Sequence, residues 1–158
     1  MQSLNKIAEG SEHSVYQDRL SGDLLSDVIK LTQIGLFGDY YELDGIRISQ
    51  FKCTPGQYLK RLELLDGFGL SMEPMGITSR GQIVSRQKFI EGECPSQKEV
   101  NEFMEEGGMI PVKSACFLWK MEAENGIETW IGDVRDENFV KTPAGLVPID
   151  VRMWVRSV

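Results

Sequence analysis

The sequence is poor in cysteine and in long apolar runs, and each shortage excludes a class of protein. Only 3 of its 158 residues are cysteines, widely spaced and without a CxxC pair, which disfavours a disulfide framework and a zinc site. No uncharged stretch approaches the ~20 residues that cross a bilayer, and residues 1–10 lack the apolar core of a signal peptide. We therefore expect a cytoplasmic protein with no membrane partner, whose Cys53, Cys94 and Cys116 are packed or surface thiols.

Basic residues are too few and too dispersed for a nucleic-acid surface. Lys and Arg total 17 against 24 Asp and Glu, a formal net charge of −7, and the longest basic cluster is the pair Lys60-Arg61. Because DNA and RNA binders usually need a basic face to replace counterions on the phosphates, no nucleic-acid partner is expected. A small anionic ligand remains compatible with this balance. His13 is the only histidine, so we expect a polar loop residue rather than a metal ligand.

The length and the composition of the chain are those of one globular domain. The first part of the chain has the residue pattern of a β-sheet. Strand-like residues 4–7 and 14–17 flank a glycine-containing turn and predict a hairpin. A turn at residues 21–23 precedes a third strand at residues 27–32, which is apolar and β-branched. Lys30 is expected near the end of this strand. Taken without other motifs, this position is also typical of an ordinary surface lysine.

The middle of the chain mixes one clear helix with less definite segments. Residues 35–41, rich in glycine and aromatics, fit a loop or a short strand. Thr54 as a cap and Pro55 as first residue predict a helix that the following glycines end. Its apolar side chains recur at three- and four-residue intervals and are expected on one face: Tyr58, Leu59, Leu62 and Leu65. Two further strands are expected at residues 77–81 and 83–90.

The last third predicts one helix and more short strands. Ser96 followed by Glu99 resembles a capping box and predicts a second helix. Strands are expected at residues 116–121, 127–131 and, as the last of the chain, 146–151. A β layer with one inserted helix, followed by a second helix and further strands, indicates an α+β fold rather than strict βαβ alternation.

Three oxygen-bearing side chains carry the clearest chemical pattern. Asp133 and Asn138 lie on one loop, and Asp150 ends an apolar strand and is expected to be buried. A turn at residues 143–145 would bring Asn138 and Asp150 close together. Two carboxylates and an amide oxygen suit a hard cation such as Mg²⁺, usually shared with substrate phosphates. The alternative is a charged turn between two strands.

The spacing of these residues resembles the protein-kinase-like superfamily. Asp133, then Asn138, then Asp150 twelve residues later is similar to the catalytic loop and metal-binding strand of that superfamily. Gly132 before Asp133 is similar to kinase-like phosphotransferases that have Gly rather than Arg there. Residues 28–30 are similar to the strand that presents the phosphate-binding lysine, and residues 7–16 lie where the glycine-rich lid would be.

Finer motifs resemble the small kinase-like domain of polyvalent proteins of phages and mobile elements. They are Glu9-Gly10-x-Glu12-His13-x-Val15-Tyr16, Val28-Ile29-Lys30-Leu31-Thr32 with Gly35-x-Phe37-Gly38, and Pro55-x-x-Tyr58-Leu59-x-Arg61-Leu62. The resemblance covers about residues 5–155. It implies a single, truncated kinase-like domain, with an N-terminal lobe of antiparallel sheet plus helix at about residues 1–92 and a minimal C-terminal lobe at residues 93–158.

The resemblance also implies a role for each site residue. Lys30 would hold the α/β-phosphates of ATP as a point charge. Asp133 would orient a hydroxyl nucleophile and accept its proton, and Asn138 and Asp150 would hold Mg²⁺. The ligands would therefore be ATP and Mg²⁺, with an acceptor or partner protein that the sequence does not identify.

Further residues would surround the nucleotide in the same resemblance. Gly10 and Ser11 would let the lid backbone approach the phosphates. Backbone groups near Phe89, Ile90 and Glu91 would form the hinge against the adenine. Glu63 is the candidate carboxylate partner of Lys30. In the alternative interpretation, Glu63 is a solvent-exposed helix residue without this role.

The sequence also departs from the protein-kinase pattern, and these departures allow an inactive protein as an alternative to an active enzyme. The lid has one glycine where protein kinases often have three, and Asp150 is followed by Val151-Arg152 rather than Phe-Gly. Only eight residues follow Asp150, so a peptide-binding platform would have to come from another chain. The leading expectation is a phosphotransferase that acts on a hydroxyl, and the alternative is an inactive pseudokinase that binds nucleotide or protein.

Overall fold

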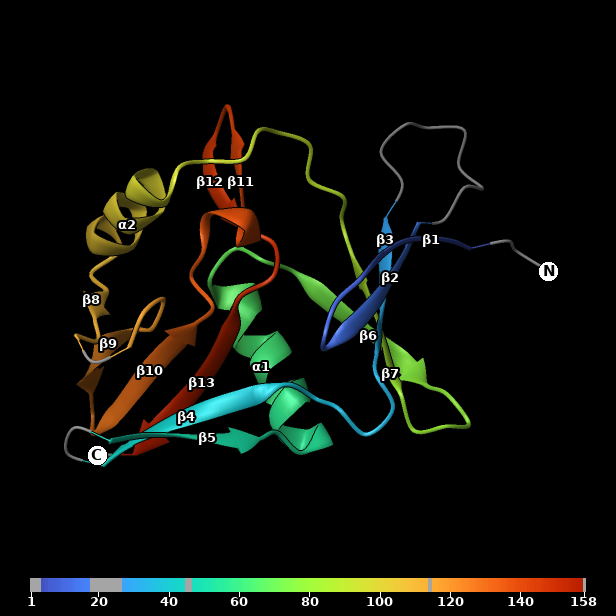
Figure 1. Ribbon diagram of the computed structural model, residues 1–158, viewed down its shortest axis with the longest axis horizontal. Coiled ribbons are helices and arrows are strands. Elements are labelled where there is room, and N and C mark those ends of the chain that lie inside the picture. Colours follow the sequence, from blue (N-terminus) through green and yellow to red (C-terminus); the bar gives the residue numbers. More distant parts are fainter. Residues whose placement is uncertain (1–3, 18–26, 45–46, 114, 158) are drawn as a thin grey trace. The chain divides into compact units, whose positions relative to one another are not determined.

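The computed structural model describes residues 4–17, 27–44, 47–113 and 115–157. The chain divides into two compact units (Figure 1): unit 1 comprises Met1–Gly38 and Lys52–Ile90, and unit 2 comprises Asp39–Phe51 and Glu91–Val158. Each unit combines antiparallel strands with one α-helix, so the α+β class is confirmed. The three cysteines are free, with Cys53 buried and the other two exposed, as expected.

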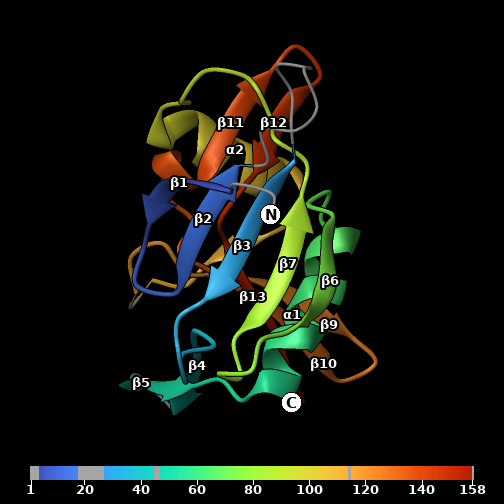
Figure 2. The same ribbon diagram turned by 90° about the vertical axis from the view of Figure 1, so that its right-hand side faces the viewer.

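Unit 1 is a five-stranded antiparallel sheet with one helix on it (Figure 2). Its elements are β1 (Asn5–Glu9), β2 (His13–Gln17), β3 (Val28–Thr32), α1 (Pro55–Gly67), β6 (Met72–Ile77) and β7 (Ile83–Gln87). The strand order in space is β1-β2-β3-β7-β6. The helix is inserted between the third and fourth strands of this sheet in sequence order, and it packs alongside β6.

The first two strands form the predicted hairpin, and the third differs in one respect. The Gly10 amide donates to the His13 carbonyl at 2.8 Å, which closes the turn. The turn expected at residues 21–23 lies outside the described residues. Lys30 occupies the middle of β3 rather than its end, and it is only 6% exposed. The expected position near the strand end is therefore wrong, and so is the alternative of a surface lysine, because β3 pairs with neighbours on both sides.

One face of this sheet is buried under α1. Side chains on a strand alternate between faces, and the buried positions of β3 and β7 are Val28, Lys30, Thr32, Ile83, Ser85 and Gln87. His13 lies on the same face and bonds the Tyr58 hydroxyl of α1 at 2.8 Å. On the opposite face, Arg86 forms an exposed ion pair with Glu73. The helix therefore covers the face that contains Lys30.

α1 begins where the sequence predicts, but its buried face is different. Thr54 caps it in a capping box with Gln57, which satisfies free amide groups at the helix start. Leu59 was expected on the apolar face but is exposed, whereas Arg61 is buried. The apolar periodicity could not predict the burial of Arg61, because the carboxylate that pairs with it, Glu12, lies 49 positions away.

The strand expected at residues 77–81 is wrongly placed, because β6 ends at Ile77. The segment after it is a turn, in which the Thr78 hydroxyl accepts from the amides of Arg80 and Gln82. Pro74 obscured the strand in the sequence, since proline cannot donate to a sheet ladder. It is tolerated here because β6 is an edge strand.

Unit 2 contains one helix and three small antiparallel sheets. Its elements are β4 (Asp39–Asp44), β5 (Arg47–Lys52), α2 (Gln97–Glu106), β8 (Ile110–Pro111), β9 (Trp119–Glu124), β10 (Ile127–Gly132), the short 3₁₀ helix η1 (Asp136–Asn138), β11 (Phe139–Thr142), β12 (Gly145–Pro148) and β13 (Arg152–Ser157). The sheets are β13-β10-β9-β8, β11-β12 and β4-β5. The final strand is thus β13, and the expectation of one ending at residue 151 is wrong.

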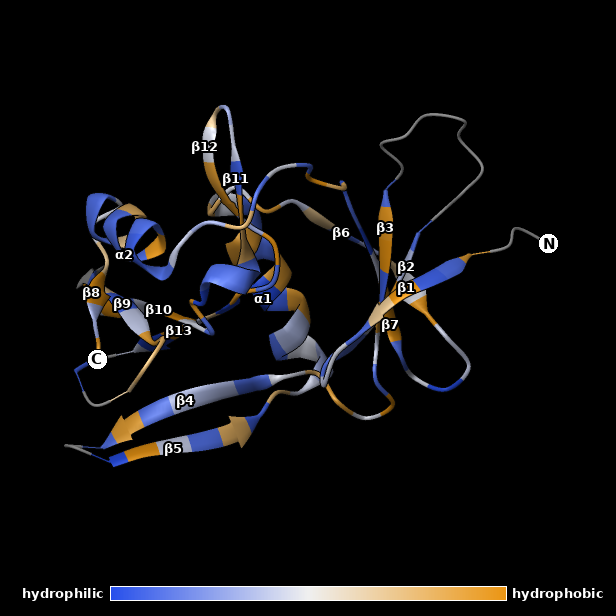
Figure 3. Cartoon of the chain, turned by 45° about the horizontal axis from the view of Figure 1, so that its top comes forward, coloured by the Kyte–Doolittle hydropathy of each residue, from blue (hydrophilic) through white to orange (hydrophobic). Residues whose placement is uncertain are grey.

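The segment at residues 35–41, expected as a loop or a short strand, is both: residues 35–38 lie outside any strand, and residues 39–41 begin β4. The hairpin β4–β5 is assigned to unit 2. The Trp154 indole of β13 donates to the Tyr41 carbonyl at 3.1 Å, and Arg156 donates to the Leu43 carbonyl at 2.9 Å. The hairpin packs on a core that contains Trp130. Hydrophilic and hydrophobic residues are interleaved along both strands (Figure 3), so no apolar run marked them in the sequence.

α2 confirms the second predicted helix. Ser96 and Glu99 form the capping box, and Gly107 follows the last helical residue. Hydrogen bonds from the Lys141 ammonium and from Ser96 hold the pKa of the Glu99 carboxyl at about 2, and Lys141 thereby ties α2 to β11. Among the residues that the structure describes, no helix is both long and apolar enough to span a membrane.

A buried ion pair connects the β1–β2 turn to α1. Arg61 donates to Glu12 at 2.6 Å, and these side chains are 4% and 11% exposed. The second guanidinium nitrogen of Arg61 lies 3.2 Å from the Cys53 sulfur. Gly38, in the left-handed region at φ +77°, packs closely against this pair: a Cβ there would overlap Glu12 Oε2 and lie 2.6 Å from Arg61 Nη1.

This packing predicts that Gly38→Ala destabilises the protein more than Gly35→Ala. Gly35 is also left-handed, at φ +70°, but a Cβ there would meet nothing within 4 Å. Both variants should lose about 1–2 kcal/mol from backbone strain, and Gly38→Ala a further ~1–3 kcal/mol from overpacking. Urea unfolding of the two variants measures the difference. Equal losses would contradict the close packing at Gly38.

Candidate functional site

The loop after β10 places Asp133 in an unusual backbone conformation. Asp133 has φ 60°, a region that non-glycine residues adopt at some cost and that is common at functional sites. The Asn138 side-chain nitrogen donates to the Asp133 carbonyl at 2.8 Å, and Asn138 is the last residue of η1. The loop therefore fixes Asp133 and Asn138 relative to each other.

The hairpin β11–β12 brings the third residue of the set to this loop. Phe139 pairs with Pro148 across the hairpin, and the Ile149 amide donates to the Asn138 carbonyl at 2.8 Å. Asp150, the next residue, lies in the bend before β13 and is exposed. The turn therefore brings Asn138 to Ile149, the residue before Asp150, and closeness of the Asn138 and Asp150 side chains stays a prediction. The expected burial of Asp150 is wrong, because β12 ends at Pro148.

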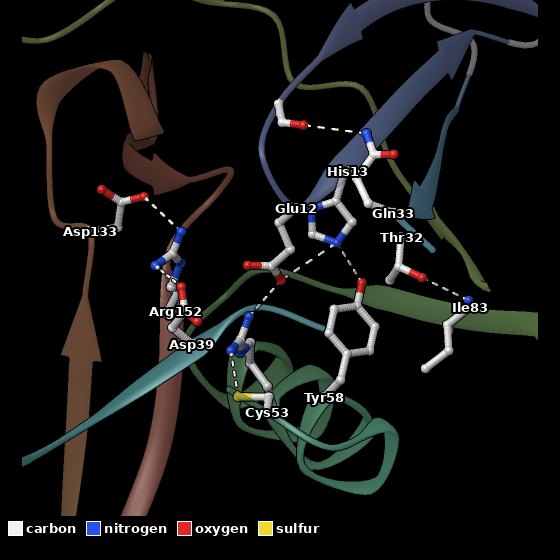
Figure 4. Close-up of polar contacts among 12 residues, drawn as sticks. Glu12, His13, Thr32, Gln33, Asp39, Cys53, Tyr58, Ile83, Asp133 and Arg152 are labelled. Carbon is white, nitrogen blue, oxygen red and sulfur yellow. Dashed lines mark hydrogen bonds and ion pairs between the residues drawn. The ribbon is translucent and has the colours of Figure 1, made fainter. Parts of the chain in front are cut away.

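Two arginines balance the charge of Asp133, and neither was among the expected site residues. Arg135 Nε lies 3.1 Å from Asp133 Oδ1. Arg152 lies 4.0 Å from Oδ2 of the same carboxylate (Figure 4). Arg152 also lies 3.6 Å from Asp39, which accepts a hydrogen bond from Gln50 at 2.8 Å. The position of Arg135, two residues after Asp133, was the only sequence signal for this network.

A small pocket opens beside Asp133 within unit 2. Its volume is about 130 Å³. It is lined by Tyr41, Ile48, Ala115, Cys116, Phe117, Leu118, Gly132, Asp133 and Arg135. The Arg135 guanidinium lies over the Phe117 ring at 4.8 Å, a cation–π arrangement. The Asp133 carboxylate thus borders a pocket with apolar and aromatic walls, where an acceptor group could lie.

The donor atoms of this loop fit a hard divalent cation. The Asn138 amide nitrogen is engaged by the Asp133 carbonyl, so its oxygen is the atom that would bind a cation, together with the Asp150 carboxylate. Among the described residues, no group of three or more His, Cys, Asp and Glu side chains could hold a metal ion. A cation bound here would complete its coordination with water or substrate oxygens, as Mg²⁺ usually does.

In unit 1, the lysine and its expected carboxylate partner lie in different environments. Lys30 is buried on the face covered by α1. Glu63 is exposed and forms an ion pair at 2.6 Å with Lys60, one turn earlier on the helix. The structure therefore favours the alternative for Glu63, an exposed helix residue.

The lid segment is held to α1 by side chains that the sequence analysis did not select for the site. Gly10 and Ser11 form the exposed part of the turn between β1 and β2. His13 is buried at the start of β2 and bonds Tyr58, so the expectation of a polar loop residue is wrong. Glu12 is bonded by Arg61. The spacing gave no sign of either partner, since both contacts span more than 40 residues.

The expected hinge residues follow β7 at the boundary between the units. Phe89 is exposed and Ile90 is partly buried, and both belong to unit 1. Glu91 is exposed and begins the second segment of unit 2. Lys30 belongs to unit 1, whereas the Asp133 loop belongs to unit 2.

Comparisons of the chain with protein-family models, curated proteins and solved structures find no match. Assignment to the kinase-like superfamily therefore stays a prediction from the motifs.

Proposed function

We propose that the protein is a kinase-like phosphotransferase of the cytoplasm that transfers a phosphoryl group from ATP·Mg²⁺ to a hydroxyl of an acceptor. Unit 1 would act as a lobe of antiparallel sheet plus helix, and unit 2 as a minimal C-terminal lobe. The observation that carries the proposal is a pair of hydrogen bonds in unit 2, from the Asn138 side-chain amide to the Asp133 carbonyl and from the Ile149 amide, next to Asp150, to the Asn138 carbonyl. They support this function because the three side chains are those the chemistry needs.

Each residue would have a defined part in the transfer. Lys30 would bind the phosphates as a cation. The acceptor oxygen would form a bond to the γ-phosphorus while the bond from that phosphorus to its bridging oxygen breaks, releasing ADP, and Asp133 would take the hydroxyl proton. Asn138 and Asp150 would hold Mg²⁺, which supplies charge neutralisation at the transferring group.

The contacts of the Asp133 carboxylate leave one of its oxygens, Oδ2, suited to accept a proton from the acceptor hydroxyl. Oδ1 is bound by Arg135, whereas Oδ2 is 4.0 Å from Arg152, longer than a hydrogen bond. Oδ2 would therefore receive the acceptor hydroxyl. The pocket beside Asp133 is the place from which that hydroxyl would approach.

The same ion pair favours a second candidate function. The Arg135–Asp133 contact at 3.1 Å would compete with an acceptor hydroxyl for the carboxylate. If this contact persists when nucleotide is bound, the protein would be a pseudokinase, a module that binds nucleotide or protein without turnover.

The first test is thermal unfolding with ATP, with and without Mg²⁺. Ligand at 100 times its Kd stabilises the native state by about 2.7 kcal/mol, so ATP with Mg²⁺ should raise the melting temperature of the wild type. Asp150→Asn should lose the metal-dependent part of this rise. Asp136→Asn, on the same loop, should keep it, because Asn retains the oxygen that accepts from the Glu137 amide.

Each outcome of this test has a distinct meaning. No response of the wild type at millimolar ATP would contradict both candidate nucleotide functions. An unchanged Mg²⁺ dependence in Asp150→Asn would remove Asp150 from the metal site. Binding without ADP formation over a broad panel of hydroxyl acceptors would favour the pseudokinase.

A further inference from the structure

Two buried polar atoms of β7 have no hydrogen-bond partner among the residues that the structure describes. They are the Ser85 hydroxyl oxygen and the Gln87 side-chain oxygen, on side chains that are 1% and 4% exposed. An unsatisfied polar group in such a place destabilises the folded protein, and native proteins have few of them. Their presence points to a ligand that supplies the missing hydrogen bonds.

The sheet register places both atoms on the same face as Lys30. Ser85 pairs directly with Lys30, and Gln87 pairs with Val28; directly paired residues of antiparallel strands point to one face. Ser85 and Gln87 are two residues apart, about 7 Å along the strand. The three side chains therefore form a polar strip from Lys30 through Ser85 to Gln87, which leads along β7 toward Phe89.

The neighbours of this strip are apolar. Gln87 lies between Val28 and Met72 in the sheet, and both are buried. A flat ring could pack on these side chains, as in most ligand sites, where few polar groups fix the orientation within apolar walls. Because the strip is nearly inaccessible, the covering side chains would move when such a ring enters.

The chemistry of the strip specifies the ligand. The oxygen of Gln87 only accepts hydrogen bonds, so its partner must be an N–H or O–H donor. In the proposed function Lys30 binds phosphates, so the other end of the strip would be the phosphate end of the ligand. A nucleotide with an exocyclic amino group on its base satisfies both requirements, and a base with a carbonyl at that position does not.

We propose that Gln87 and Ser85 read the base of the bound nucleotide, with the Gln87 oxygen accepting a hydrogen bond from the 6-amino group of adenine. This inference rests on the proposed nucleotide function and adds its base specificity. Gln87 and Ser85 are specificity residues in this assignment, and Lys30 keeps its place at the phosphates.

Calorimetric binding of three nucleotides tests the proposal. ATP carries the 6-amino group, purine riboside triphosphate lacks it, and inosine triphosphate has an oxygen in its place. The wild type should bind ATP at least about five-fold more tightly than either analogue, the factor for one unmade buried hydrogen bond. Gln87→Leu should weaken ATP binding and bring the affinities for ATP and purine riboside triphosphate within about two-fold of each other.

Stability without nucleotide is a second, independent measurement. Leucine removes the unsatisfied oxygen of Gln87, so Gln87→Leu should unfold at an equal or higher urea concentration than the wild type. Gln82→Leu is the matched control, since the Gln82 amide already donates to the Thr32 carbonyl at 2.8 Å. It should lose stability and keep the preference for ATP.

The outcomes separate this inference from the proposed function. If the wild type binds all three nucleotides equally, or Gln87→Leu keeps the preference for ATP, base reading is wrong and the nucleotide function stands. A clear loss of stability in Gln87→Leu would assign Gln87 a structural role instead. If the wild type binds none of the three, both proposals fail.

Discussion

Replacing Asp133 by Asn is expected to lower phosphoryl transfer by about 10²–10⁴-fold, the usual contribution of a general base. Asn keeps the size of the side chain and an oxygen for Arg135, but it cannot take the hydroxyl proton. ATP binding should persist, because Lys30 and Asp150 are unchanged. The measurements are ADP release and incorporation of phosphate into the protein itself, alongside the nucleotide-dependent rise in melting temperature.

Asp136→Asn is the matched control for this variant. It makes the same chemical change three residues later on the same loop, at a side chain whose oxygen accepts only from the Glu137 amide in the described contacts. Its transfer rate should stay within about two-fold of the wild type, because it would make no contact with the reacting groups. Equal rates in Asp133→Asn and the wild type would remove Asp133 from the reaction.

The second large effect is expected on stability, from Arg61→Met. This change leaves Glu12 buried without the guanidinium that bonds it at 2.6 Å. Breaking a buried pair by removing one partner costs about 3–5 kcal/mol. Urea unfolding monitored by circular dichroism measures the loss.

The adjacent residue offers a control for the same interaction at the surface. Lys60 also forms an ion pair at 2.6 Å, with Glu63, but these side chains are 59% and 68% exposed. Lys60→Met should therefore cost less than about 1 kcal/mol. The double variant Arg61→Met with Glu12→Gln should recover part of the loss, because it no longer buries a carboxylate that has lost its guanidinium. Similar losses of unfolding free energy in the Lys60 and Arg61 variants would contradict the expectation that burial makes the Arg61–Glu12 ion pair the more important of the two.

Segments whose hydrogen bonds join near neighbours could be predicted from the sequence. Both capping boxes connect residues three positions apart, so Thr54 and Ser96 mark the helix starts without any tertiary contact. The loop of the candidate site is similar, since the Asn138 side chain reaches the Asp133 carbonyl five residues away. Local geometry of this kind depends on the order of residues alone.

The environments of the charged residues required the tertiary structure. Arg61 and Glu12 are 49 positions apart, and their pairing put an arginine on the helix face where Leu59 was expected. Lys30 is buried because its strand is flanked on both sides, whereas Asp150 is exposed because the chain bends before β13. Residue type predicts neither outcome, since burial of a charge depends on distant partners.

The sequence by itself determined the α+β class, the two helices, the hairpin at Gly10 and the grouping of Asp133 with Asn138. Tertiary packing alone decided that β4–β5 joins unit 2, where Trp154 bonds Tyr41 across 113 positions, and that Ser85 and Gln87 face the same side as Lys30. The physical reason is that caps and turns are stabilised by bonds within a few residues. Strand pairing and side-chain burial depend instead on which distant segments meet.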